Sequence, residues 1–223
     1  MKKIFPFLLT ILLFAMGGCQ TSPTPTSIIS PTITPIITPT PVEKLVFEKE
    51  FKDPAEPWCE GGSYDFGDFY CQDGEYHLVA KGEGNIATMN DGDFKNFILQ
   101  AQMHSIENVG GYGVVFRGQN NSPATFYIFQ ISPHNGQYQL IKWSQREDQN
   151  GVLIPWTDSD AIKKSLETNE LKVLGQGSQI TLYINGEQLA TITDDSFTHG
   201  TVGPVVTGQG HAALIYLKVW ELP

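Results

Sequence analysis

Short runs of β-branched and aromatic residues, separated by Gly, Asn and Asp, are the feature that most constrains the fold of this chain. These runs fill the sequence from Glu43 onward and are typical of an all-β domain. No long amphipathic helical period occurs there, which excludes an α/β architecture. Strands are predicted over Leu45–Phe51, Glu75–Ala80, Asn96–His104, Tyr112–Arg117, Thr125–Ser132, Gln137–Ser144, Glu170–Leu174, Gln179–Ile184, Gln188–Thr193, Gly200–Val206 and Ala212–Trp220.

Turn-forming dipeptides support these boundaries. Asn185-Gly186 gives the strongest hairpin signal, because both residues tolerate the positive φ that a type I′ turn requires. Asp73-Gly74, Asn135-Gly136 and Asn150-Gly151 indicate further chain reversals. One or two helical turns are expected over Ser159–Leu166, with a serine or aspartate as the N-cap.

The N-terminal residues have the pattern of an export signal. Two lysines precede an apolar stretch, Ile4–Phe14, that is too short for a membrane span. The segment Ala15-Met16-Gly17-Gly18-Cys19 resembles the lipobox of bacterial lipoproteins, although Met16 replaces the usual Leu. The resemblance implies that residues 1–18 are a signal peptide and that Cys19 is acylated. The alternative is an ordinary secretory signal in which Cys19 is incidental.

Residues 19–42 form a segment rich in Thr and Pro, in which proline recurs too often for a helix or a central strand. An extended, polyproline-like chain is expected, with a rise of about 3 Å per residue. We therefore expect an exported protein that is anchored through lipid to the outer face of a bacterial membrane, with a spacer that lifts residues 43–223 from the surface.

Cys59 and Cys71 remain as a pair once Cys19 is assigned to the anchor. In an exported protein such a pair predicts a disulfide. A zinc site is the weaker alternative, because no His or second Cys pair has the spacing of zinc ligands nearby. A loop of this length closed by a disulfide adds about 3 kcal/mol of stability in the chain-entropy description.

The formal net charge of −10 excludes nucleic acid as a natural partner, because like charge opposes binding to phosphates. The length left after the leader and spacer corresponds to one domain, which we expect to be monomeric.

Several phrases of the sequence together carry a family resemblance. They are G-Y-G-V-V-F-R-G-Q, F-Y-I-F-Q-I-S with G-Q-Y-Q-L-I-K-W, P-W-T-D-S-D-A-I, N-E-L-K-V-L-G-Q-G-S-Q-I-T-L-Y-I-N-G and D-D-S-F-T-H-G-T-V-G. In this order they resemble the concanavalin A-like lectin/glucanase superfamily, near the laminin G-like and 3-keto-disaccharide hydrolase-type branch, over Leu45–Leu222. The resemblance implies an antiparallel jelly-roll sandwich of two sheets, one of which has a concave face for an extended ligand.

Candidate ligand-binding residues follow from this resemblance and from how proteins hold sugars. Aromatic rings stack on the C–H faces of sugars, while amides and guanidinium groups bind hydroxyls. Similarity to the hydrolase branch places Gln130 and Arg117 on the concave face, and a guanidinium at a strand end is seldom there for packing alone. Packing in the core is the alternative for each aromatic residue. The candidates are Arg117, Gln130, Tyr138, Lys142, Trp143 and Trp156.

No catalytic residue is predicted. Retaining glycoside hydrolysis needs two carboxylates about 5 Å apart, and the E-x-D-x-x-E strand of the family 16 glucanases does not occur here. Relatives of the hydrolase branch tend to carry an acid two residues before Gln130, where this chain has Ile128. The histidines show no metal-binding spacing.

The acidic pair Asp194 and Asp195, followed by Thr198 and Gly200, lies in a loop where some relatives hold calcium. Oxygen ligands suit a hard cation, so a structural calcium ion is a possible cofactor, with a solvated turn as the alternative.

The leading hypothesis is therefore a cell-surface lipoprotein whose jelly-roll domain binds glycans or glycoconjugates without cleaving them. A glycoside hydrolase or related sugar-cleaving enzyme is the first alternative. A protein-binding envelope scaffold, which predicts an exposed apolar patch, is the second.

Overall fold

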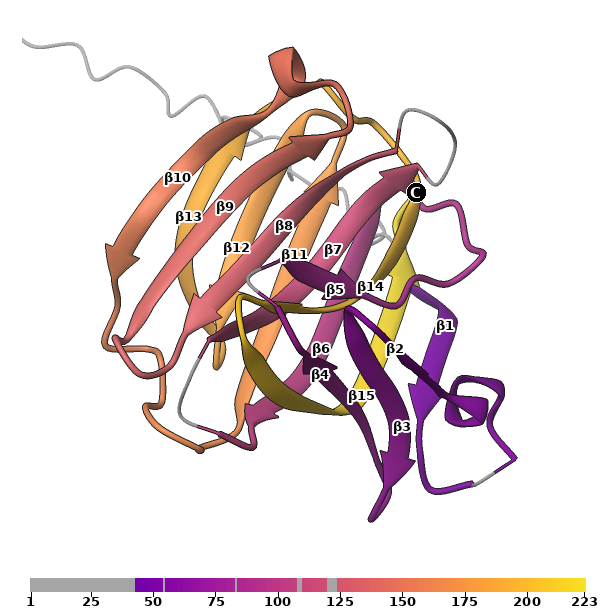
Figure 1. Ribbon diagram of the computed structural model, residues 1–223. Coiled ribbons are helices and arrows are strands. Elements are labelled where there is room, and N and C mark those ends of the chain that lie inside the picture. Colours follow the sequence, from indigo (N-terminus) through magenta and orange to yellow (C-terminus); the bar gives the residue numbers. More distant parts are fainter. Residues whose placement is uncertain (1–42, 54, 83, 108–109, 120–123) are drawn as a thin grey trace, which may run out of the picture. The chain divides into compact units, whose positions relative to one another are not determined.

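The computed structural model describes residues 43–223 except 54, 83, 108–109 and 120–123. The signal peptide, Cys19 and the Thr/Pro segment lie outside the described residues. The described part consists of strands and two short 3₁₀ turns, arranged as two antiparallel sheets (Figure 1). Within it, no helix is long and apolar enough to span a bilayer.

The nine-stranded sheet has the order β13-β12-β11-β6-β15-β4-β3-β2, and β1 also pairs with β15. Its strands are β1 (Lys44–Glu50), β2 (Gly62–Tyr64), β3 (Gly67–Gln72), β4 (Glu75–Ala80), β6 (Phe97–Ser105), β11 (Asn169–Gln176), β12 (Gln179–Ile184), β13 (Glu187–Thr193) and β15 (Gly210–Glu221).

The six-stranded sheet has the order β10-β9-β8-β7-β14-β5. Its strands are β5 (Asn85–Ala87), β7 (Gly111–Gln119), β8 (Thr125–Ser132), β9 (Gln137–Ser144), β10 (Gly151–Asp158) and β14 (Thr201–Thr207). Figure 1 views the molecule from the side of this sheet. The predicted all-β sandwich is confirmed.

The core lies between the two sheets and follows from strict alternation along the strands. On β6, Phe97, Leu99, Ala101 and Met103 are fully buried, and the residues between them are partly exposed. Because successive side chains of a strand point to opposite faces, one row of β6 packs into the sandwich and the other faces outward.

The predicted hairpin turns are present. Asn185 and Gly186 have φ of 50° and 84°, and Asp73 and Gly74 have φ of 54° and 83°, as type I′ turns require. The predicted helical turns at Ser159–Leu166 are wrong. Asn169 is fully buried and binds both the N–H and the carbonyl of Lys163, at 2.8 and 2.9 Å, so its side chain replaces the hydrogen bonds a helix would make there.

Four strands were not predicted, namely β2, β3, β5 and β10. Strands β2 and β3 lie in the Gly- and Asp-rich loop between the cysteines, and β5 has only three residues, so none of them shows a clear period of two. Strand β10 contains Pro155, which is tolerated because β10 is the edge strand of its sheet.

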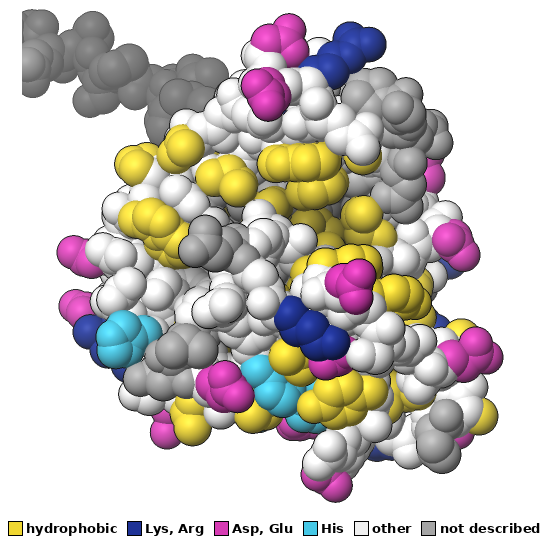
Figure 2. All heavy atoms as spheres, in the orientation of Figure 1, with side chains coloured by type: hydrophobic (Ala, Val, Ile, Leu, Met, Phe, Trp, Pro, Cys, Tyr) yellow, Lys and Arg dark blue, Asp and Glu magenta, His cyan; other side chains and the backbone are white. Residues whose placement is uncertain are grey.

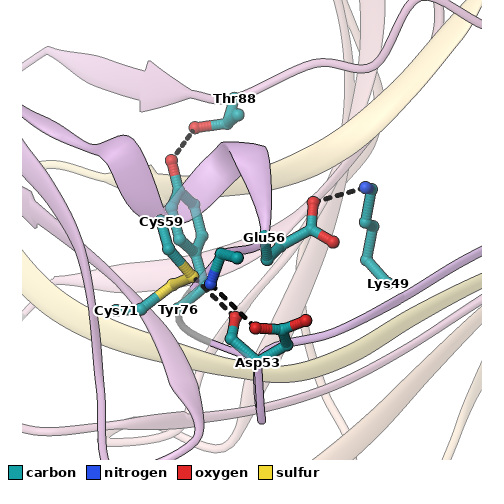
Figure 3. The surroundings of a disulfide bond; sticks show 8 residues. Lys49, Asp53, Glu56, Cys59, Cys71, Tyr76 and Thr88 are labelled. Carbon is teal, nitrogen blue, oxygen red and sulfur yellow. Dashed lines mark hydrogen bonds and ion pairs between the residues drawn. A yellow bond between two sulfur atoms is a disulfide. The ribbon is translucent and has the colours of Figure 1, made fainter.

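The predicted disulfide between Cys59 and Cys71 is formed (Figure 3). It joins β3 to the short turn η1 (Pro57–Glu60). An ion pair between Lys49 and Glu56 ties the segment before η1 to β1.

Candidate functional site

The outward face of the six-stranded sheet carries the side chains that alternate with the core. On β8, Tyr127, Phe129 and Ile131 belong to the core. Phe126 and Ile128 lie on the opposite face, as the sequence predicted, and Gln130 shares their side of the strand.

Apolar side chains form a floor on this outward face. Val115, Ile128 and Val205 are fully buried and come from the three neighbouring strands β7, β8 and β14. Partly buried Ala87, Met89, Phe126 and Ile141 surround them. Figure 2 shows the same side of the molecule, with hydrophobic side chains gathered in a hollow. We call this cluster the apolar floor.

A groove of about 580 Å³ crosses one end of the same face, and we call it the amide groove. Each of the six strands contributes to it: Trp156 from β10, Gln139 from β9, Gln130 and Ser132 from β8, Gly111 from β7, Thr207 from β14 and Asn85 from β5. The turn residues Gly110, His134, Asn135 and Gly208 complete the lining. A groove that runs across the strands suits an extended ligand.

Two facing amides form the polar centre of the amide groove. Gln130 and Gln139 are paired in the β8–β9 register, and the Gln130 Nε2 donates to the Gln139 Oε1 over 2.6 Å. The Oε1 of Gln130 is buried and accepts no hydrogen bond from the described residues. Leaving a buried acceptor unpaired costs about 1–3 kcal/mol.

Gly111 leaves space at the base of the amide groove because it has no side chain. A Cβ at this position would lie 2.7 Å from the carbonyl oxygen of Ile131 and 2.8 Å from the Oγ1 of Thr207. A larger residue would therefore force β8 or β14 to move. At the end of the groove on β10, Trp156 is 42% exposed and offers an accessible ring.

Among the predicted binding residues, Gln130 and Trp156 line the amide groove. Tyr138 is 6% exposed and packs in the core. Trp143 lies away from the groove, with its ring stacked on Phe126 at 4.6 Å between centroids. Lys142 donates to the Ser196 Oγ over 2.8 Å, and its Nζ lies 3.6 Å from a carboxylate oxygen of Asp194.

The prediction that Arg117 lies on the concave face is wrong, because its side chain is fully buried. Simple alternation from Val115 would turn it outward, but the pairing of β7 with β8 shifts between Phe116 and Gln119, and Arg117 has a φ of 51°. This bulge redirects the guanidinium. It donates to the carbonyl oxygens of Phe197, Gly177 and Lys95 over 3.2, 2.6 and 3.4 Å. Burial lowers its pKa, and the nearby Tyr127 and Asp194 oppose that shift.

Asp194, one of the two residues predicted to hold calcium, is engaged by neighbouring protein groups. The Oδ1 of Asp194 accepts hydrogen bonds from the Tyr127 hydroxyl and from the Ser196 N–H, the latter over 2.9 Å. Burial raises the pKa of Asp194, but these hydrogen bonds and nearby Lys142 outweigh it and lower the pKa overall. Among the described residues, no three His, Cys, Asp or Glu side chains gather as a possible metal site around Asp195 or elsewhere.

Sequence reasoning missed most of the amide groove. Gln139 could have been predicted from the sequence, because the Asn135-Gly136 turn fixes the hairpin register that places it opposite Gln130. Asn85 and Thr207 could not have been predicted to line the groove. Strand β5 is too short to recognise in the sequence, and its pairing with β14 joins segments that are far apart in the chain.

Among the described residues, the lining of the amide groove contains no Asp or Glu. Ile128, at the position where an acid was considered, is buried in the apolar floor. The described lining thus offers no carboxylate pair for glycoside hydrolysis.

Known structures share this fold. A Bacillus subtilis protein of unknown function with a galectin-like fold matches at 13% identity, with a TM-score of 0.62, over 82% of this chain and 99% of that chain. The catalytic domain of an endo-1,3-beta-glucanase (laminarinase) from Thermotoga petrophila matches at 9% identity, with a TM-score of 0.56, over 82% and 99%. A Bacteroides ovatus GH16 protein matches at 9% identity, with a TM-score of 0.53, over 77% and 94%.

At the level of sequence, no curated protein matches this chain. The model of the 3-keto-alpha-glucoside-1,2-lyase-like domain family matches residues 47–220, which is nearly all of the described part. The family lies in the concanavalin A-like superfamily that the sequence phrases indicated. This chain belongs to the 3-keto-alpha-glucoside-1,2-lyase-like domain family.

Proposed function

We propose that this protein is a lipid-anchored surface protein that binds a glycan in the amide groove without cleaving it. The observation that carries the proposal is a groove lined by the amides of Gln130 and Gln139, by hydroxyls and by the exposed ring of Trp156. Amides and hydroxyls of the lining would hydrogen-bond to sugar hydroxyls, and the indole would cover a C–H face of a sugar ring.

The shape and chemistry of the groove favour binding over hydrolysis. Hydrolysis by a carboxylate pair requires acids about 5–10 Å apart across the scissile bond. The described part of the lining supplies neutral amides and hydroxyls, and the titratable side chain among these residues is that of His134. One structural neighbour is named an endo-1,3-beta-glucanase and another is named for a mixed linkage glucan, which adds support for a glycan as the ligand.

Cleavage of a glycan is the second candidate function, and the family supports it, because its name refers to a lyase. A lyase needs a base near the sugar, and His134 is the residue of the lining that could accept a proton. This alternative predicts product formation that is lost in His134→Ala.

The test is binding of the purified chain to a panel of polysaccharides, comprising β-glucan, galactan, starch, mannan and a uronic-acid polymer, by affinity electrophoresis and titration calorimetry. We expect at least one neutral polymer to bind and Trp156→Ala to weaken it about tenfold, the order expected for one aromatic contact. Leu166→Ala is the control, since Leu166 is an apolar residue of similar exposure, 51%, outside the groove.

Two results would contradict the proposal. One is an unchanged affinity in Trp156→Ala. The other is release of new sugar ends or unsaturated products by the wild type but not by His134→Ala, which would establish the second candidate.

Anchoring through Cys19 is tested separately in the bacterial host. We expect the wild type to enter the detergent phase with an acylated N-terminal peptide, and Cys19→Ala to stay in the aqueous phase. Equal partitioning of both forms would refute the lipid anchor and leave the groove argument unaffected.

A further inference from the structure

A second hollow, of about 610 Å³, lies next to strand β5, and we call it the aromatic pocket. Its wall carries five aromatic residues from η1 and the strands that follow: Trp58, Tyr64, Phe66, Phe69 and Tyr76. Ala87, Thr88 and Met89 form the side toward the six-stranded sheet. The amide groove contains none of these residues.

Two of the rings are held open to solvent. Tyr64 and Phe66 are 50% and 57% exposed, and their rings stack at 5.1 Å with an interplanar angle of 8°. Phe69 meets both rings edge-on, at 6.1 and 6.3 Å. Exposed aromatic side chains that are ordered against one another, at the rim of a hollow, are typical of a binding surface.

The wall of the aromatic pocket is fixed by cross-links. The disulfide joins Cys59, next to Trp58, to Cys71 on β3, the strand that carries Phe69 (Figure 3). The Tyr76 hydroxyl and the Thr88 Oγ1 form a hydrogen bond of 2.7 Å, which ties the wall to the segment after β5. Such a preformed wall reduces the entropy lost when a ligand binds.

The aromatic pocket and the amide groove both border strand β5. Asn85 lines the groove and Ala87 lines the pocket, and the residue between them, Ile86, points into the core. Asn85 and Ala87 therefore share the outward face of the strand. Ala87 and Met89 also pack against the apolar floor, so the two hollows border one surface.

The charges of both linings restrict the ligand. The described lining residues include no lysine or arginine in either hollow, and the one carboxylate among them belongs to Glu60. The chain as a whole carries a formal net charge of −10. An acidic polymer would be repelled by this net negative charge, with no lysine or arginine among the described lining residues to offset the repulsion. An uncharged sugar chain has no such electrostatic cost when it enters either hollow.

We infer that the ligand is a long, uncharged glycan that occupies the amide groove and continues across β5 onto the rings of Tyr64 and Phe66. The inference rests on the proposed function and adds a second contact region to it. A glycan long enough to reach both hollows gains stacking contacts that a short fragment cannot make.

The test uses two ligands: the neutral polysaccharide that binds best in the panel, and its short fragments separated by length. Binding of each ligand is measured for the wild type, for the double variant Tyr64→Ala/Phe66→Ala and, separately, for the single variant Trp156→Ala. We expect the double variant to lose about tenfold or more in affinity for the polymer and to bind the shortest fragment like the wild type. Trp156→Ala should lose affinity for both. The conservative Tyr64→Phe should retain wild-type binding, and matched thermal unfolding shows that each variant is folded.

The outcomes separate this inference from the proposed function. If Trp156→Ala weakens binding and the double variant binds the polymer normally, the amide groove stands and the extension to the aromatic pocket is refuted. If neither variant changes binding, the proposed function fails as well. Tighter binding of the uronic-acid polymer than of any neutral polymer refutes the uncharged ligand. Equal loss for polymer and fragment in the double variant also refutes the extension.

Discussion

Replacing Arg117 should destabilise the fold and leave ligand contacts intact. The sequence had instead suggested that Arg117 binds the ligand. The guanidinium is fully buried and donates to three carbonyl oxygens, those of Phe197, Gly177 and Lys95. Hydrogen bonds to a charged group contribute about 1.5–3 kcal/mol each. Counting only the two shorter ones, Arg117→Ala should lower the free energy of unfolding by about 4 kcal/mol.

The backbone at Arg117 provides an internal check. At a φ of 51° a residue with a Cβ costs about 1–2 kcal/mol more than glycine. Arg117→Gly should therefore be about 1 kcal/mol more stable than Arg117→Ala, the opposite of the usual order in a strand. Urea unfolding followed by tryptophan fluorescence measures both variants. A loss below about 1 kcal/mol in Arg117→Ala would refute the buried hydrogen-bonding role, and so would glycan affinity that falls while stability is unchanged.

Three further results are expected. Replacing Cys59 and Cys71 together by serine should lower the free energy of unfolding by about 3 kcal/mol, measured by urea unfolding; an unchanged midpoint would contradict it. Burial lowers the pKa values of His77 and His211, whose Nδ1 and Nε2 atoms respectively lie 2.9 Å apart, so the unfolded chain binds more protons on acidification. Stability should be constant above the ordinary histidine pKa of 6.5 and fall as pH drops from there through the lowered folded-state values; the same pH profile in His211→Gln would refute this assignment. Gly111→Ala should reduce glycan affinity at least about tenfold, because its Cβ would lie 2.7 Å from a carbonyl oxygen of β8, and unchanged affinity in calorimetry would show that the groove floor is not used.

Most of the fold was predictable because its long strands are runs of β-branched and aromatic residues bounded by turn residues. The bounds predicted for Thr125–Ser132, Gln137–Ser144 and Gln179–Ile184 agree with β8, β9 and β12. The prediction failed where local signals compete: a buried amide, Asn169, replaces helical hydrogen bonds, and β5 has three residues paired with a strand far along the chain.

The candidate site was only partly predictable, and Arg117 shows why. Alternation assigns a face only while a strand stays regular, and one bulge after Phe116 turned the strongest candidate into a core residue. Gln130 lies where β8 pairs regularly with β9, and it lines the amide groove. Trp156 lies on the rim of the amide groove as a result of the irregular pairing between Ile154 and Thr157, which has no sequence pattern.

Pro155 also has a consequence for how copies of this domain behave when they are crowded together. It has no N–H to offer at the free side of β10, and the register shifts on both sides of Ile154 break the regular spacing of the remaining groups. A strand from a neighbouring molecule therefore finds no continuous ladder to extend at that border. The indole of Trp156 is therefore exposed beside an unpaired sheet edge that does not favour strand pairing between molecules.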